Sequence, residues 1–167
     1  IMIDTTTLEA FYGKIFVANK NILDMPANEM IAYLQMQFKR TENGTEFSDK
    51  AKLEKEVRLL TSESDETRND GLTPKNLKMI RDGIADQLTI AFFLAFKVNG
   101  FKYEKLELSA PAPKSYTEYC ECTEATIEAF KKACFETNDI ADANFLLNNL
   151  IAQLYLVPEF TAFDVDF

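Results

Sequence analysis

Apolar residues recur along most of this chain at the three- and four-residue spacing of helices, and the alternation typical of strands is confined to short stretches. Proline, glycine and Asn-Gly steps separate the periodic segments, as expected of connections between helices. The pattern predicts an all-α fold, a bundle of five to six helices. The expected helices cover residues 8–22, 27–38, 48–69, 73–98, 116–135 and 139–157.

Capping residues predict where the two central helices begin and end. The first of them should start near Ser48, a common N-cap, and stop at Asn69-Asp70-Gly71. Thr73-Pro74 should open the next helix, because proline is favoured in a first turn, and Asn99-Gly100 should close it. The short connection between them makes the two helices antiparallel neighbours.

A stretch rich in alanine and proline, residues 106–114, divides the chain unequally. We expect residues 1–105 to form a helical core and residues 106–167 to form a C-terminal helical extension of the same domain. With 167 residues and 47% hydrophobic content, the chain is long enough for one well-buried core.

The charge balance narrows the classes of partner. With 27 acidic and 18 basic residues the formal net charge is −9, which opposes binding to nucleic acid or to anionic membranes. The apolar run Leu88–Phe96 is about half the ~20 residues that a membrane span needs. A phosphorylated small molecule can still bind an acidic protein if a divalent cation lies between them.

The absence of histidine excludes several kinds of site at once. Ser-His-Asp and Cys-His nucleophiles, His-ligated zinc and the Glu-x-x-His di-iron bundle are all ruled out. The three cysteines are Cys120, Cys122 and Cys134, and they do not have the spacing of metal ligands. No secretory leader is expected. They are therefore expected to be reduced thiols in a cytoplasm.

Carboxylates gather on the helix expected over 48–69. Leu53, Val57 and Leu60 define its buried stripe, which then continues into Glu63, Ser64 and Thr67. Glu66 lies three residues further on, roughly 60° around the helix, so both carboxylates point the same way. The core face is therefore expected to become acidic over its last two turns.

A second acidic pair precedes the apolar half of the next helix. Asp82 and Asp86 are four residues apart, and Asp86 shares a face with Ile90 and Phe93, so it is expected to point inward. In an antiparallel pair, all four carboxylates would lie together. Such a cluster requires neutralisation, and oxygen ligands favour Mg²⁺ or Mn²⁺.

The two segments that carry these residues are LLTSESDET (59–67) and IRDGIADQL (80–88). Together they resemble the two-helix signature of the MazG-like all-α nucleoside triphosphate pyrophosphohydrolases, above all the phage-type members related to phosphoribosyl-ATP pyrophosphohydrolase. In that family a Glu-x-x-Glu pair and a Glu-x-x-Asp pair bind Mg²⁺. Carried over, Glu63 and Glu66 form the first pair and Asp86 ends the second. Gly83 stands where the second pair has Glu, and Asp82 would substitute.

The resemblance covers roughly residues 8–100 and implies an enzyme that cleaves a nucleoside triphosphate, expected to be a dNTP, to monophosphate and pyrophosphate. Glu63 and Glu66 would be catalytic, and Glu63, Glu66, Asp82 and Asp86 would bind the metal. A homodimer or homotetramer in the cytoplasm, including the host cytoplasm of a phage, is implied as well. Five cations near in sequence are candidates for phosphate contact: Lys52, Lys55, Arg68, Lys97 and Lys102.

Two non-enzymatic interpretations stay open at this point. The chain could be a non-catalytic acidic helical interaction protein, or a nucleotide-binding module that has lost turnover with its irregular second pair. A weaker version of the same acidic pattern occurs downstream, where Glu124 and Glu128 precede Asp139 and Asp142. It indicates either a degenerate second repeat or chance, with Asp139 acting as a helix cap.

Overall fold

The computed structural model describes residues 44–104 and 113–154. Apart from Gly44, these residues belong to one compact unit, Thr45–Phe167. The helices expected over 8–22 and 27–38 lie outside the described residues, as does the segment after residue 154. The proposed division into 1–105 and 106–167 stays a prediction.

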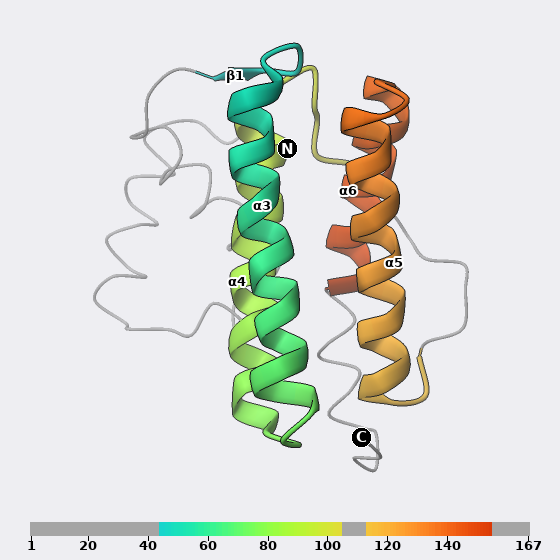
Figure 1. The fold of residues 1–167 in the computed structure, drawn as a ribbon. Coiled ribbons are helices and arrows are strands. Elements are labelled where there is room, and N and C mark those ends of the chain that lie inside the picture. Colours follow the sequence, from blue (N-terminus) through green and yellow to red (C-terminus); the bar gives the residue numbers. More distant parts are fainter. Residues whose placement is uncertain (1–43, 105–112, 155–167) are drawn as a thin grey trace, which may run out of the picture. The chain divides into compact units, whose positions relative to one another are not determined.

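The described part of the chain is all-α, as predicted (Figure 1). A parallel pair of two-residue strands, β1 and β2, is its only sheet. Because two expected helices lie outside this part, the total of five to six stays a prediction. The elements are β1 (Thr45–Glu46), α3 (Lys50–Glu66), η2 (Thr67–Leu72), α4 (Leu77–Lys97), β2 (Val98–Asn99), α5 (Tyr116–Phe135) and α6 (Ile140–Leu154).

The bounds of α5 agree with the prediction and α3 begins near Ser48 as predicted, whereas the predicted start of α4 was wrong. The carboxylate of Asp49, not Ser48, caps α3 by accepting the N–H of Lys52 at 3.3 Å. An acidic cap is the better partner for the positive end of the helix dipole. Asn76 caps α4 in place of Thr73-Pro74, which precede the helix in the turn.

The predicted stop at Asn69-Asp70-Gly71 was also wrong, because the chain continues from α3 directly into the π-helix η2. Its wider turns are marked by bonds between residues five apart, such as Thr73 N–H to the Arg68 carbonyl at 2.9 Å. Single π-turns of this kind are rare and are frequent at functional sites. η2 therefore extends the helical part of the chain from the end of α3 to Leu72.

α3 and α4 are antiparallel neighbours, as predicted (Figure 1). Glu56 pairs with Lys97 at 3.9 Å, while Thr67 bonds to Gln87, so the contacts run in opposite directions along the two helices. Buried aliphatic and aromatic side chains fill the space between these helices and the α5–α6 pair. No described helix is long and apolar enough to cross a membrane.

Thr67, the residue that directly follows α3, lies against α4 at Gly83. A Cβ atom at this position would lie 2.0 Å from Thr67 Oγ1 and 2.9 Å from Thr67 Cβ. Real Cβ atoms do not come so close to other heavy atoms, so the helices touch here only because Gly83 has no side chain. This contact sets the spacing of the two helices beside the predicted acidic cluster.

Gly83→Ala tests this contact through the sign of its effect. Helix propensity alone would make alanine stabilising by about 1 kcal/mol. Overlap with Thr67 should instead lower the free energy of unfolding by about 1–3 kcal/mol, measured by urea denaturation. Because Thr67→Ala removes the nearest atom, the double variant should lose less than the two single variants together. A more stable Gly83→Ala protein would contradict the close contact.

Candidate functional site

The four predicted carboxylates lie at one end of the α3–α4 pair. Glu63 is half-buried in the last turn but one of α3, and Glu66 is the final residue of that helix. Asp82 and Asp86 lie in the first half of α4, and both are exposed, as is Glu66. Because the helices are antiparallel, the end of α3 meets this part of α4.

The predicted orientation of the acidic residues needs correction. The buried stripe of α3 continues through Ser64 and Thr67, as predicted, and these residues are 5% and 2% exposed. Glu63, which was predicted to lie on the same stripe, is only half-buried beside it. Asp86 was expected to point inward and is exposed. The cluster therefore lies along the solvent-facing edge of the helix pair, where a ligand can reach it.

Electrostatics brings the four residues together as one group. Partial burial raises the pKa of Glu63, and the negative charges of Asp86, Glu66 and Asp82 raise it further. The pKa of Asp86 is raised by partial burial and then by Asp82 and Glu66. Each of the four residues thus takes part in mutual repulsion across the two helices, which favours protonation or a bound cation.

The donor set suits Mg²⁺ or Mn²⁺, because all four groups are hard oxygen ligands. Among the described residues, no group of three or more Asp, Glu or Cys side chains lies closely enough together to hold a metal ion by itself. Mg²⁺ does not require one, since it commonly binds one or two carboxylates, several waters and substrate phosphates. The residues therefore fit a cation that a phosphorylated ligand helps to hold.

A buried polar network lies directly behind the cluster. The Thr67 hydroxyl donates to the Glu63 carbonyl oxygen at 2.7 Å and accepts from Gln87 Nε2 at 2.9 Å. Gln87 is 1% exposed and adjoins Asp86 in the sequence. Sequence reasoning missed this role of Gln87, because a single polar residue inside an apolar helix gives no periodic signal.

The close contact at Gly83 explains why the second acidic pair, Asp82 and Asp86, departs from the Glu-x-x-Asp pattern that the resemblance implies. Position 83, where the resemblance implies Glu, faces Thr67 so closely that no side chain fits. An acidic residue is therefore accommodated one position earlier, at Asp82, which is exposed and acts electrostatically on both Glu63 and Asp86.

Two of the five candidate phosphate-binding cations are engaged elsewhere. Arg68 binds Glu124 of α5 through two bonds of 2.6 and 2.9 Å, and Lys97 pairs with Glu56. These contacts join separate helical elements, and they leave neither Arg68 nor Lys97 free to bind a phosphate. The three others are exposed: Lys52, which pairs with Asp49 at 3.9 Å near the start of α3, Lys55 and Lys102.

The residues of the weaker downstream acidic pattern have structural roles. Glu124 forms the pair with Arg68, and Glu128 pairs with Lys131 at 3.1 Å. Asp139 accepts the N–H of Asp142 at 3.1 Å, so it caps α6, as one of the two interpretations predicted. These contacts give no support to a second metal-binding pair.

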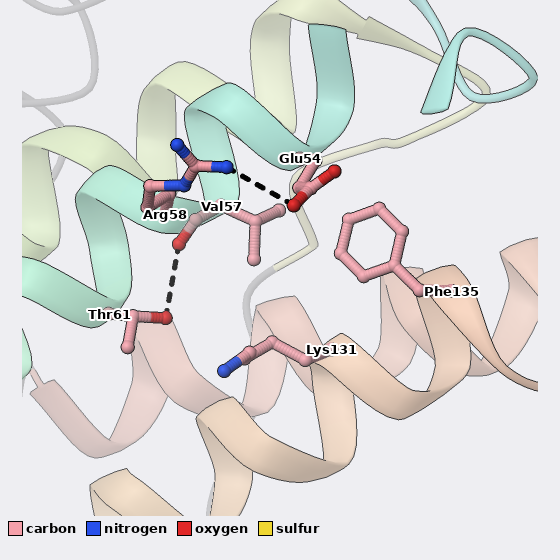
Figure 2. Close-up of a pocket in the computed structure, with 6 residues that line it drawn as sticks. All are labelled: Glu54, Val57, Arg58, Thr61, Lys131 and Phe135. Atoms are coloured by element: carbon pink, nitrogen blue, oxygen red, sulfur yellow. Dashed lines mark hydrogen bonds and ion pairs between the residues drawn. The ribbon is translucent and has the colours of Figure 1, made fainter. Parts of the chain in front are cut away.

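The opposite flank of α3 faces α5 across an open groove of about 410 Å³ (Figure 2). Its two cations already have carboxylate partners on their own helices: Arg58 binds Glu54 at 3.2 Å, and Lys131 binds Glu128. The groove thus offers no unbalanced charge and none of the four clustered carboxylates. It is lined by Glu54, Val57, Arg58, Thr61, Lys131 and Phe135.

Comparisons of this chain with protein-family models, with curated proteins and with solved structures found no match. The MazG-like resemblance therefore rests on the residues of this chain alone.

Repulsion within the cluster predicts that Asp86→Asn raises the melting temperature in metal-free buffer. A raised pKa means that the folded protein binds the proton more tightly than the unfolded chain. Proton binding by Asp86 therefore stabilises the folded protein most at pH values below the ordinary carboxyl pKa. This stabilisation is lost as the pH rises through the raised pKa. The variant should therefore gain about 1–3 °C at pH 7, and the gain should shrink towards pH 4.

Circular dichroism melts at both pH values measure this difference. Asp65→Asn is the matched control, because Asp65 is exposed on α3 and does not contribute to the raised pKa of Glu63 or Asp86. A loss of stability in Asp86→Asn at pH 7, or an equal gain at both pH values, would show that the cluster does not repel.

Proposed function

We propose that this protein is a Mg²⁺-dependent nucleoside triphosphate pyrophosphohydrolase. One observation carries the proposal: Glu63, Glu66, Asp82 and Asp86 from two antiparallel helices act on one another electrostatically at an accessible edge. In a protein of net charge −9, a divalent cation would favour the binding of a triphosphate, and this cluster would supply its ligands.

Glu66, Asp82 and Asp86, with Glu63, would hold the metal. Bound Mg²⁺ would neutralise the phosphates and make a coordinated water more acidic. All four side chains are oxygen donors, and three are exposed, so they can turn towards a cation that arrives with the substrate. Their backbone positions are set by α3 and α4, which limits the reorganisation to side-chain rotation.

Glu63 is assigned the role of general base. In the metal-free protein, partial burial and its acidic neighbours raise the pKa of Glu63, and its place among the other three carboxylates is what suits it to accept a proton. It would accept a proton from the water that attacks the α-phosphorus. The new bond forms between the water oxygen and the α-phosphorus, the bond to the bridging oxygen breaks, and pyrophosphate leaves with that electron pair.

A nucleotide-binding module without turnover is the second candidate, and the structure around Gly83 favours it over an acidic interaction protein that binds no nucleotide. The missing side chain at this position removes one ligand that the resemblance implies, while the remaining cluster still attracts a cation. Binding of Mg²⁺ with a triphosphate, without release of pyrophosphate, would identify this case. A homodimer or homotetramer is proposed for either function.

Glu66→Gln is the sharpest variant for the proposed activity. Glu66 is exposed at the last residue of α3, so the amide should leave the fold intact while removing a charged ligand. With Mg²⁺ and a dNTP, kcat should fall at least about 100-fold. Pyrophosphate release measures the rate, and circular dichroism checks the fold.

Asp65→Asn again provides the control, because the neighbouring residue has the same chemistry outside the cluster. Asp65→Asn should keep the wild-type kcat, and EDTA should abolish the activity of the wild-type protein and of this control. Full activity in Glu66→Gln would refute the assignment of the site, even if the wild-type protein hydrolyses triphosphates.

A further inference from the structure

We infer that Gln87 and Thr67 are positioning residues, which hold the backbone of Glu63 in α3 at a fixed place beside Asp86 in α4. The inference rests on the proposed function, because its consequence is a preorganised metal site. It concerns two buried neutral residues.

The two residues join both halves of the acidic cluster through hydrogen bonds. Thr67 Oγ1 donates to the carbonyl oxygen of Glu63 at 2.7 Å, so the hydroxyl is tied to the backbone of one carboxylate residue. Gln87 Nε2 donates to the same hydroxyl at 2.9 Å, and Gln87 directly follows Asp86. One chain of bonds thus spans the interface from α4 to Glu63.

The direction of these bonds follows from donor and acceptor chemistry. The single Thr67 hydroxyl proton goes to the Glu63 carbonyl, so Oγ1 can only accept from Gln87. The amide group of Gln87 must therefore turn its NH₂ towards Thr67. Its Oε1 is then left buried, with no hydrogen-bond partner within the described part of the chain.

The unpaired Oε1 indicates that Gln87 is not present for stability. A buried acceptor without a partner is destabilising, and an apolar side chain of similar length would avoid that cost. Thr67 would keep its bond to Glu63 in such a variant. What would be lost is the bond between the helices, directly behind the carboxylates that the proposed function uses.

Gly83 makes the arrangement possible. Because any Cβ at position 83 would overlap the Thr67 side chain, the hydroxyl sits against α4 within reach of Gln87, one helical turn further on. Residues behind metal ligands commonly set ligand orientation, and their loss weakens metal affinity or activity by about 10- to 100-fold. Gln87 and Thr67 have the position that such a role requires.

Gln87→Met and Thr67→Val test the inference through metal affinity. Calorimetric titration with Mn²⁺ should give dissociation constants about 10- to 100-fold weaker than wild type for both variants. The melting temperature of Gln87→Met without metal should equal or exceed that of the wild type. Thr67→Ser, which keeps the hydroxyl, should bind Mn²⁺ almost as tightly as the wild-type protein.

The chain contains a matched control in Gln153→Met. Thr126 Oγ1 lies 3.0 Å from the Cys122 carbonyl oxygen and 3.0 Å from the Gln153 side-chain amide, so a similar threonine–glutamine pair joins α5 to α6 far from the cluster in sequence. Its loss should leave the Mn²⁺ affinity unchanged. A fall in affinity in this control as large as in Gln87→Met would overturn the positioning role.

Two further outcomes separate the inference from the proposed function. If the wild-type protein binds Mn²⁺ and both Gln87→Met and Thr67→Val bind it equally well, the positioning role is wrong and the metal site stands. If the wild-type protein binds no Mn²⁺, with or without a triphosphate, the proposed function itself is wrong. A folded Gln87→Met with much lower thermal stability would make Gln87 a packing residue and overturn the inference.

Discussion

The contact between Gly83 and Thr67 is the constraint on which the arrangement of this helix pair depends. It allows the end of α3 to lie against α4 without an intervening side chain. Glu63 and Asp86 thereby come close enough for their charges to interact. The same contact excludes an acidic side chain from position 83, so Asp82 is the nearest residue of α4 that can complete a second pair.

Close approach of four negative charges opposes folding, and the structure limits that cost in two ways. The carboxylates lie at the solvent-facing edge of α3 and α4, where water screens three of them. The polar groups that face the core at this level are neutral: Ser64, Thr67 and Gln87. Repulsion that is tolerable without a ligand becomes a source of affinity once a divalent cation binds.

Much of this architecture could be predicted from the sequence, because helical spacing is a strong signal over long segments. The bounds of α5 and the cap at Asp139 agree with the structure. The direction of Asp86 could not be predicted, because the apolar half of α4 is hydrophobic on all sides and so does not define one inward face. The π-helix also left no sequence signal, since it passes through Asn69-Asp70-Gly71, residues that normally end a helix.

Incubation with a panel of dNTPs and NTPs in the presence of Mg²⁺, with chromatographic separation of the products, tests the central claim most directly. The account predicts equimolar monophosphate and pyrophosphate from at least one nucleotide, and no products once EDTA is added. Release of inorganic phosphate and a nucleoside diphosphate instead would show that water attacks the γ-phosphorus and not the α-phosphorus. No turnover with Mg²⁺ or Mn²⁺ across the whole panel would contradict the enzymatic function.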